Sequence, residues 1–503
     1  MAIFPTKDQP QSEGVAFGVG ALFGIIAHLG FFIHGEWHIQ APQIVRSHSA
    51  ILCIAVVGAV YYNDQSTLGK LFRAVITGSI SYMITLLLSI VTYRVAPRLH
   101  RLTRAEFPGP WLLRTSKLWH VWACRTSMNH FFLDDLFRRY GDFVRTGPSE
   151  ITVFHPDVFA ATDGPETECS KAEWYDLLHP DRALLTSRDR AVHDARRRDW
   201  KLGFINRALQ SHADKALKHA NILCENIHAD AIVGRPSAMR DLFYWYGFDL
   251  MGDFVMNKPF GMLRDKEWQH IVVRLQHALS LLGPASPAPW LVQLAFHLGP
   301  KIYQVRSWNL MAQWSWDEIN SRLRDGFAKQ PAPDLIHYLL EETNQAGNLE
   351  SLYTMRGDTL QAIVAGSEPI PIILLGIFSE LVRAPQHQEL IYQELVDHDI
   401  RDVDIENYKA LGRLPHLNAV IQEVLRLYPV ILTGAPRKSG SNGVIIAGTY
   451  IPPHTTIVSP RYTIQRRADC FPQPDKFIPE RWTTRRAELM KNTNAYNPWG
   501  TAI

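Results

Sequence analysis

The feature that most constrains this chain is a set of three long apolar runs near its N-terminus. They span Val15–Ile33, Ala50–Tyr62 and Ala74–Tyr93. A run of about 20 apolar residues is long enough to cross the hydrocarbon core of a bilayer as a helix. A buried core helix is the alternative for any one run, but three runs ahead of any globular pattern favour membrane insertion. We therefore expect two or three transmembrane helices within residues 15–98.

Charges around these runs predict which way the chain is oriented. Arg94, Arg98, Arg101 and Arg104 follow the third run. Basic flanks stay on the cytosolic side of a membrane, so the rest of the chain is expected to face the cytosol. Residues 1–14 are polar and are expected to lack a fixed structure. Residues 99–112 contain Phe107-Pro-Gly-Pro-Trp111 and are expected to form a stiff linker to a large domain at residues 113–503.

Composition excludes several functional classes. The net charge of +3 is too small to indicate nucleic-acid binding. The five cysteines are unevenly spaced and predict neither a disulfide framework nor a zinc site, as expected for a cytosolic domain. The histidines show no metalloprotease or zinc spacing either, so the chain's own residues predict no metal site.

A second strong constraint lies near the C-terminus, at Glu423 and Arg426. Residues three apart share one face of a helix. The apolar stripe of this helix is Leu417, Val420, Ile421, Val424, Leu425 and Tyr428. Charges that apolar neighbours bury must be paired, or they cost several kcal/mol. We therefore expect an ion pair between Glu423 and Arg426, with Arg481 as a third partner.

The motifs that follow this helix identify a family. They are, in order, Pro436-Arg437, a predicted hairpin at Val444–Pro453, the segment Arg466–Trp482 with its Pro-Glu-Arg-Trp end, and Asn497-Pro-Trp-Gly500. This ordered series resembles the C-terminal half of the cytochrome P450 family of haem-thiolate monooxygenases, and the resemblance covers roughly residues 107–500. It implies a mainly α-helical fold with small β-sheets, and haem as the cofactor.

The resemblance also implies which residues contact haem. In the family, the helix that matches His193–Trp200 sends basic residues and often a tryptophan to the haem propionates, so His193, Arg197 and Trp200 are candidates. Arg437 and Trp499 are the further candidates. A solvated basic helix is the alternative, and we favour that interpretation for Arg196 and Arg198.

A central apolar helix is predicted at Asp358–Val382, and it carries Ala365-Gly-Ser-Glu-Pro-Ile370. The family pattern has a glycine, an acid and two threonines here, and the first threonine assists proton delivery to bound oxygen. Gly366 and Glu368 match, but Pro369 replaces that threonine and is expected to bend the helix. Proton delivery is then left to Ser367, Glu368, water or substrate. The change also suggests an alternative function, a haem enzyme that rearranges an oxygenated substrate without activating oxygen.

The cysteine that ligates haem iron in this family comes about seven residues after the aromatic residue that Trp499 matches. The sequence given ends at Ile503, and none of Cys53, Cys124, Cys169, Cys224 and Cys470 lies in that loop. The sequence therefore predicts a truncated chain that is inactive as given. A non-catalytic truncated membrane protein is a further alternative.

Within the family, the chain is most similar to fungal microsomal members of secondary-metabolite pathways. The segment His34–Pro42 resembles the anchor of proteins of the tryprostatin hydroxylase type, and Leu281–Pro300 falls where the family has its substrate-access lid. A buried connector is the alternative for the second segment. The resemblance implies hydroxylation or epoxidation of an apolar natural product, electrons from NADPH–cytochrome P450 reductase, and residence in the endoplasmic reticulum membrane.

Overall fold

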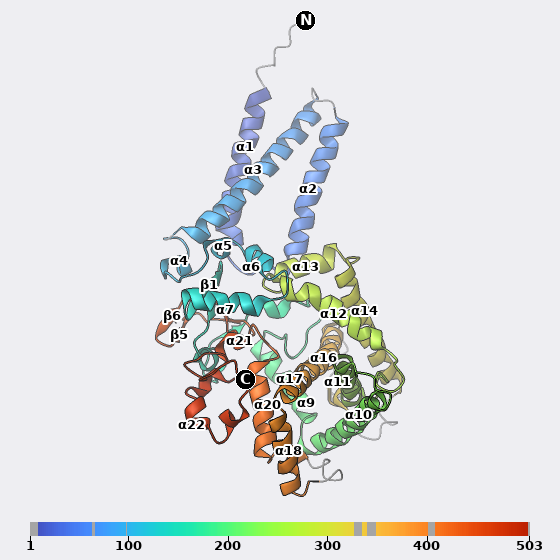
Figure 1. Cartoon of the computed structure of the whole chain (residues 1–503). Coiled ribbons are helices and arrows are strands. Elements are labelled where there is room, and N and C mark those ends of the chain that lie inside the picture. The colour runs from blue at the N-terminus through green and yellow to red at the C-terminus, as the bar shows by residue number, and fades with distance from the viewer. Residues whose placement is uncertain are drawn as a thin grey trace.

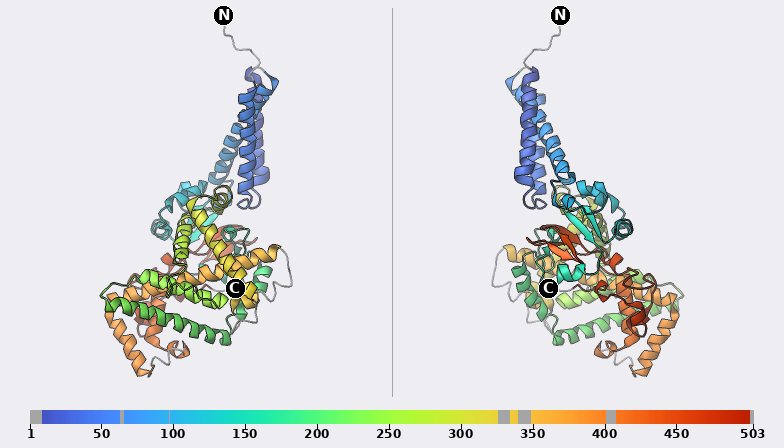
Figure 2. Two further views of the ribbon diagram at one scale, coloured as in Figure 1. Left: turned by 90° about the vertical axis from the view of Figure 1, so that its right-hand side faces the viewer. Right: turned by 90° about the vertical axis from the view of Figure 1, so that its left-hand side faces the viewer.

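The computed structural model describes residues 9–62, 66–96, 98–325, 334–339, 349–400 and 408–500. Three long helices form a stalk that projects from a larger domain (Figure 1). They are α1 (Gln9–Ala27, continued by a short π-helix at His28–Phe32), α2 (Ala41–Tyr61) and α3 (Thr67–Val95). Each is long and apolar enough to cross a membrane. The side views place the stalk and the domain at opposite ends of one elongated molecule (Figure 2).

Two boundaries of the stalk differ from the prediction. Helix α1 begins at Gln9, so residues 9–14 are helical rather than unstructured, while the first eight residues lie outside the described part. Helix α2 begins at Ala41, well before the apolar run at residue 50, because Pro42 at its first turn favours helix initiation and the flanking residues continue the helix.

Small residues let α1 and α3 approach closely. A Cβ atom on Gly20 would lie 2.2 Å from the carbonyl oxygen of Gly78, and one on Gly24 would lie 2.1 Å from Oγ1 of Thr85. The hydroxyl of Ser81 donates to the carbonyl of Phe17 at 2.8 Å. Close backbone approach and interhelical hydrogen bonds are what hold helices together in lipid.

The predicted linker is packed against the domain. It contains the short helix α4 (Arg101–Arg104), and Trp111 begins α5 (Trp111–Thr115). Leu102 and Phe107 are buried, and the carbonyl of Pro108 accepts a hydrogen bond of 2.7 Å from the backbone of Arg145. Gly109 has a φ of 148°, and a Cβ there would lie 2.5 Å from the carbonyl of Arg145. The linker therefore lies directly on the first strand of the domain.

The domain is mainly helical, as predicted. Its remaining described helices are α6 (Leu118–Ala123), α7 (Asn129–Tyr140), α8 (Val158–Asp163), α9 (Arg190–Leu202), α10 (Asn206–Ile232), α11 (Met239–Met256), α12 (Gln269–Ala285), α13 (Pro289–Leu298), α14 (Tyr303–Asp325), α16 (Leu349–Ser367), α17 (Pro369–Arg383), α18 (Pro385–Asp397), α19 (Tyr408–Leu411), α20 (Pro415–Leu427), α21 (Arg461–Ile464) and α22 (Arg486–Leu489).

Two small sheets join distant parts of the chain. The first has the order β1-β2-β7-β4-β3, and its strands are β1 (Phe143–Gly147), β2 (Glu150–Val153), β3 (Ser170–Lys171), β4 (Arg437–Lys438) and β7 (Thr456–Val458). Strand β7 is central, since Ile457 pairs with Ile151 on one side and with Arg437 on the other. The predicted hairpin is β5 (Val444–Ile446) paired with β6 (Thr449–Ile451). The first sheet thus places the Arg437 strand beside the N-terminal strands.

The largest described core lies among α9, α11, α12, α14 and α16. Its fully buried members include Phe248, Val255, Leu275 and Ile319. The stretch Tyr353–Arg383, which covers most of α16 and all of α17, also has the length and composition of a membrane span. It instead packs against α11, α14 and α20 inside the domain. This confirms the prediction of a central apolar helix.

Candidate functional site

The predicted charge cluster is built around the carboxylate of Glu423 on α20. Arg426 donates to both of its oxygens, at 2.9 Å from Nε and 2.8 Å from Nη2. Nε of Arg481 donates at 3.3 Å, and the indole of Trp482 at 2.9 Å. Glu423, Arg426 and Arg481 are all 0% exposed. The ion pair expected from the sequence is therefore present, with Arg481 as its third member.

Both arginines also bind backbone carbonyls of the segment that follows α21. Arg426 donates to the carbonyls of Gln465, Pro474 and Lys476. Arg481 donates to those of Pro472, Gln473 and Leu489. Two buried cations share one carboxylate, and these carbonyls satisfy their remaining donors. The cluster thus fixes the loops after α21 onto α20.

The central helix is interrupted at Glu368, because α16 ends at Ser367 and α17 begins at Pro369. Proline has no N–H to continue the helical ladder. The predicted catalytic residues beside the break contact α11. A Cβ on Gly366 would lie 1.9 Å from Sδ of Met251, and the buried hydroxyl of Ser367 donates to the carbonyl of Gly247 at 3.4 Å. Ala365 is the exposed residue of this stretch.

Glu368 has an unusual electrostatic environment. Tyr244 of α11 donates to its Oε2 at 3.3 Å, whereas its buried Oε1 has no hydrogen-bond partner among the described residues. Burial is the main cause that raises the pKa of the Glu368 carboxyl. Burial, and then the charge of Glu368, raises the pKa of Tyr244 to about 12. A carboxyl whose neutral form is favoured can hold a proton at Oε1.

Helix α9 is joined to α16 by a contact that the sequence analysis missed. Arg196, which we expected to be solvated, pairs with the fully buried Asp358, while Arg198 is exposed as expected. Asp358 also accepts from the backbone of Leu184 at 2.7 Å. The sequence feature that indicates this contact is Asp358 itself, an acidic residue in an apolar helix, because a charge buried there requires a buried partner.

The three candidates on α9 lie in different surroundings. His193 is partly buried, its Nδ1 lies 3.0 Å from Oδ1 of Asp194, and burial lowers its pKa. Arg197 is one helical turn further along and is also partly buried. Trp200 packs into the large core, and its buried Nε1 has no hydrogen-bond partner in the described part of the chain.

Two arginines lie where the first sheet meets α8. Arg437 of β4 donates to Asp163 at 2.5 Å and to the hydroxyl of Tyr175 at 3.4 Å. Arg461, which the sequence analysis did not select, donates to the carbonyl of Asn497 at 2.9 Å. Its Nη1 is buried and, within the described residues, has no partner. Nothing in the sequence around Pro460 distinguishes this arginine.

Trp499, the last candidate, is 79% exposed. Two residues earlier, the carbonyl of Asn497 accepts a hydrogen bond from Arg461. The exposed indole of Trp499 and the buried guanidinium of Arg461 therefore lie in the same part of the domain. The cysteines lie elsewhere in the described structure. Burial raises the pKa of both the Cys124 and the Cys470 thiols to about 12, so neither is a thiolate at neutral pH.

Comparison with known proteins assigns the family. The family model described as "Cytochrome P450" matches residues 108–501. The chain belongs to the cytochrome P450 family. Cytochrome P450 monooxygenase FCK2 of Fusarium pseudograminearum is 31% identical over 95% of this chain and 85% of its own length. Tryprostatin B 6-hydroxylase of Aspergillus fumigatus is 30% identical over 95% of this chain and 84% of its own length. Cytochrome P450 monooxygenase phqL of Penicillium fellutanum is 31% identical over 95% and 82%.

These relatives establish the general activity of this cytochrome P450. It is a haem-dependent monooxygenase of the fungal secondary-metabolite type, as the sequence predicted. The residues present fit the carboxylate groups of haem. Nη1 of Arg461 and Nε1 of Trp200 are buried donors that lack partners among the described residues, and such donors are costly unless a ligand satisfies them.

Proposed function

We propose that this cytochrome P450 hydroxylates or epoxidises an apolar natural product at the endoplasmic reticulum membrane. Electrons would come from NADPH–cytochrome P450 reductase on the cytosolic side. The observation that carries the proposal is the family match over residues 108–501 on a domain attached to three apolar helices. The name of tryprostatin B 6-hydroxylase supports hydroxylation as the reaction class.

The proposed organisation follows the boundaries read from the sequence. Residues 15–98 would form the anchor after a polar N-terminus at residues 1–14. Residues 99–112 would form the linker, and residues 113–503 the catalytic domain. The stalk of α1, α2 and α3 supports this division, and the packed linker supports a fixed attachment rather than a flexible one.

The proposed haem contacts are His193, Arg197, Trp200, Arg437 and Trp499, together with Arg461. Haem, when bound, supplies the oxidising chemistry. The arginines and the indole N–H would bind its carboxylates, and the exposed face of Trp499 would cover apolar surface. Two buried donors that have no partner among the described residues, Nε1 of Trp200 and Nη1 of Arg461, support this assignment.

Glu368 is the proposed proton-holding residue in the place of the family's threonine pattern. Its raised pKa supports this role, and so does its Oε1, which has no hydrogen-bond partner within the part of the chain that the structure describes. Tyr244 would orient the carboxyl, because it donates to the other oxygen. Ser367 and Gly366 would position Glu368 by packing against α11 rather than by contacting the reacting atoms.

To test this function, cDNA copied from the protein's own transcript is expressed in yeast together with NADPH–cytochrome P450 reductase. Activity is then measured in the isolated microsomes. We expect a ferrous–CO spectrum of the haem-thiolate type and NADPH-dependent incorporation of one oxygen atom from labelled dioxygen, with tryprostatin B as the first probe substrate. Haem incorporation without NADPH-dependent oxygen insertion into any apolar substrate of a broad panel would contradict the proposal.

One observation favours a second candidate, an oxygen-independent haem isomerase. Pro369 replaces the threonine that the family uses near bound oxygen, and it interrupts the central helix. This candidate predicts conversion of a peroxide or epoxide substrate at the same rate with and without NADPH. The monooxygenase predicts no turnover without NADPH.

A further inference from the structure

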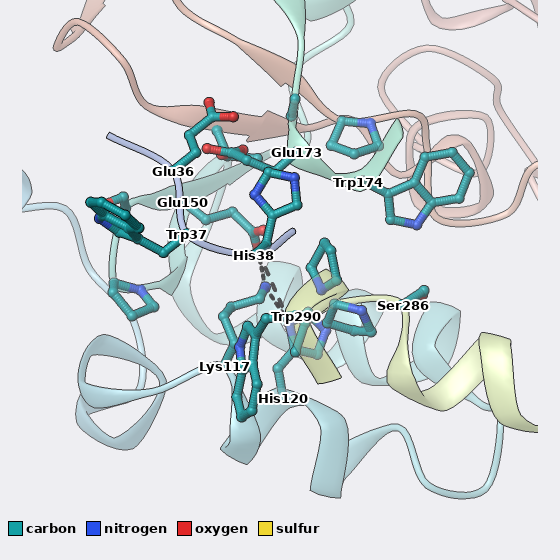
Figure 3. Close-up of a pocket in the computed structure, with 18 of the residues that line it drawn as sticks. Glu36, Trp37, His38, Lys117, His120, Glu150, Glu173, Trp174, Ser286 and Trp290 are labelled. Atoms are coloured by element: carbon teal, nitrogen blue, oxygen red, sulfur yellow. Dashed lines mark hydrogen bonds and ion pairs between the residues drawn. The ribbon is translucent and has the colours of Figure 1, made fainter. Parts of the chain in front are cut away.

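The α1–α2 connection, residues 33–40, reaches into the catalytic domain and is called here the anchor loop. It forms one wall of a cavity of about 540 Å³. The other walls come from the turn before β2, the segment 172–174, the connection between α12 and α13, and residues 433–436. Figure 3 shows Glu36, Trp37 and His38 of the anchor loop opposite Trp174, Ser286 and Trp290 of the domain.

A charge cluster holds the anchor loop in place. Arg188 binds both oxygens of Glu36, at 2.6 Å and 3.0 Å, and Lys438 of β4 adds a contact of 2.5 Å. Next to it, Nε2 of His38 lies 2.9 Å from Asp176, which also accepts from Arg188 at 2.6 Å. All these side chains are at most 28% exposed. Partly buried, bidentate pairs of this kind are stronger than surface ion pairs.

The same residues do not need a metal ion. Glu36, His38 and Asp176 are close enough together to coordinate one. Arg188, however, already contacts both carboxylates, and Lys438 contacts one of them. A cation would have to displace these side chains. We therefore treat the cluster as an ion-pair lock between the anchor and the domain.

The lining of the cavity suits an uncharged molecule with aromatic character. Trp37, Trp174 and Trp290 contribute large apolar surfaces. The charged residues of the lining are already engaged: besides Glu36, Glu173 pairs with Lys438, and Lys117 pairs with Glu150. Arg94, the other cation of the lining, donates to the backbone carbonyl of Thr115 at 2.7 Å. A ligand therefore meets indole faces and a balanced set of charges, which disfavours a charged ligand and favours an apolar one.

The cavity lies between the stalk and the part of the domain that carries Arg437. On the membrane side, Ile44 and Val45 of α2 belong to its lining, and Arg46 donates to the carbonyl of His297 on α13 at 2.7 Å. On the other side, the lining residue Pro436 precedes Arg437, and Trp174 precedes Tyr175, whose hydroxyl Arg437 contacts. A molecule in this cavity would touch both a spanning helix and the segment next to a proposed haem contact.

In this family the lid segment, here within Leu281–Pro300, borders the route by which substrate enters, and residues 286–290 of it line this cavity. We infer that in this protein the anchor loop is a specificity-determining wall of that uptake site for the apolar substrate. The inference rests on the proposed function for the apolar nature of the substrate. It goes beyond that function because it assigns substrate recognition to the membrane anchor. The lock at Glu36 keeps the wall in place, and the tryptophans select uncharged aromatic molecules that arrive from the bilayer.

The first test measures occupancy without any turnover. The full-length protein in phosphatidylcholine nanodiscs is photolabelled with an uncharged aryl diazirine, and the labelled peptides are mapped by mass spectrometry. We expect label on the anchor loop and on residues 286–290. Val45→Trp should fill the cavity and reduce this label at least several-fold relative to the label on α3. Val57→Trp is the matched control, since Val57 is an exposed residue of the same helix outside the lining.

The second test measures the lock itself. Glu36→Gln should raise hydrogen–deuterium exchange of residues 33–40 several-fold and lower the diazirine label there. Glu106→Gln removes the same charge from an exposed site in the linker and should change neither. In the active protein, Glu36→Gln should raise KM and shift selectivity while kcat and the CO spectrum stay unchanged.

The outcomes separate the two proposals. Equal labelling of the wild type and Val45→Trp, or unchanged exchange in Glu36→Gln, overturns the uptake site. Specific labelling that is lost in Val45→Trp, in a protein that never inserts oxygen, would sustain the uptake site and reject the proposed function instead.

Discussion

At the scale of single residues, the fold depends on one carboxylate that serves two buried cations. Glu423 accepts hydrogen bonds from Arg426, Arg481 and Trp482, and both arginines are fully buried. Removing one partner of a buried ion pair leaves an uncompensated charge in a low-dielectric site. The carboxylate therefore contributes to stability mainly by neutralising the two guanidinium charges, and less through its individual hydrogen bonds.

We expect Glu423→Gln to destabilise the domain by about 3–5 kcal/mol, because both guanidinium groups lose their counter-charge. Urea unfolding followed by tryptophan fluorescence measures this change. Glu488→Gln is the control, since Glu488 forms an exposed pair with Arg485 and should change stability far less. Equal effects of the two substitutions would show that the Glu423 cluster is not a stabilising element.

A second prediction at this scale concerns acid pH and His120. The buried imidazole lies 3.0 Å from the ammonium of Lys117, and Nε2 lies 2.9 Å from Asn129. Burial first, and then the charge of Lys117, lowers the pKa of His120 to about 4 from an ordinary value of 6.5. Below pH 6.5, His120 is therefore protonated in the unfolded chain but stays neutral in the folded protein. The free energy of unfolding consequently falls as the pH falls.

This single site should contribute a loss of about 1.4 kcal/mol per pH unit between pH 6.5 and pH 4. Unfolding free energies at several pH values measure the slope. His120→Gln should reduce the slope by this amount, whereas replacing the exposed His228 by glutamine should leave it unchanged. A slope that does not depend on His120 would contradict the prediction.

Helix geometry predicted contacts between charged residues that are close in the sequence, and the contact of Arg481 with Glu423 was the one expected across a long separation. Glu423 and Arg426 are three positions apart on one helix, so their pairing followed from helical geometry. Arg196 and Asp358 come from different helices, and the tertiary fold alone brings them together. Arg461 was missed for the same reason, because its surroundings come from α8 and from the segment at Asn497.

At the scale of elements, close contact between α11 and the central helix depends on glycines at the break. A Cβ on Gly247 would lie 2.8 Å from the carbonyl of Ser367, and one on Gly366 would lie 1.9 Å from Sδ of Met251. The break in the central helix could be predicted, because Pro369 acts locally by removing the backbone N–H that would continue the helical hydrogen bonds. The orientation of Gly366, Ser367 and Glu368 toward α11 was not, because it depends on which face the neighbouring helix covers.

We expect Gly366→Ala to destabilise the protein by about 1–3 kcal/mol, since the added methyl group overlaps Met251 and the core must shift to admit it. Differential scanning calorimetry measures the loss. Met251→Ala in the same chain should restore part of it by making space. Gly283→Ala is the control, because Gly283 is also helical but its nearest contact would be an ordinary 3.7 Å, and here alanine should be neutral or stabilising. No rescue by Met251→Ala would refute the steric explanation.

At the scale of the whole molecule, the stalk and the domain are attached at several places, one of which is the contact of Arg94 on α3 with the carbonyl of Thr115 on α5. The linker lies on β1, the anchor loop is locked by Glu36, and α2 contacts α13 through Arg46. The sequence indicated the three spans and the basic flank of the third. The docking of the anchor loop could not be read from it, because Glu36 and its partners Arg188 and Lys438 lie far apart along the chain.

With the three spans and the cytosolic catalytic domain that we propose, the N-terminus would lie in the lumen. We therefore expect a glycosylation acceptor on an N-terminal extension to be modified in microsomes, and the same acceptor fused to the C-terminus to remain unmodified. Endoglycosidase treatment and gel mobility measure both. Modification at the C-terminus alone, or at neither end, would reject the three-span arrangement.

The locked anchor loop has a consequence for how the enzyme meets its surroundings. A domain on a flexible tether tumbles and presents every side to the membrane and to soluble partners in turn. Attachment at several separate points restricts that rotation and, with the stalk in the membrane as proposed, would set one tilt with respect to the bilayer. The reductase proposed as the electron donor would then meet the electron-accepting side at a constant height and angle, and lateral diffusion would set how often the two proteins meet.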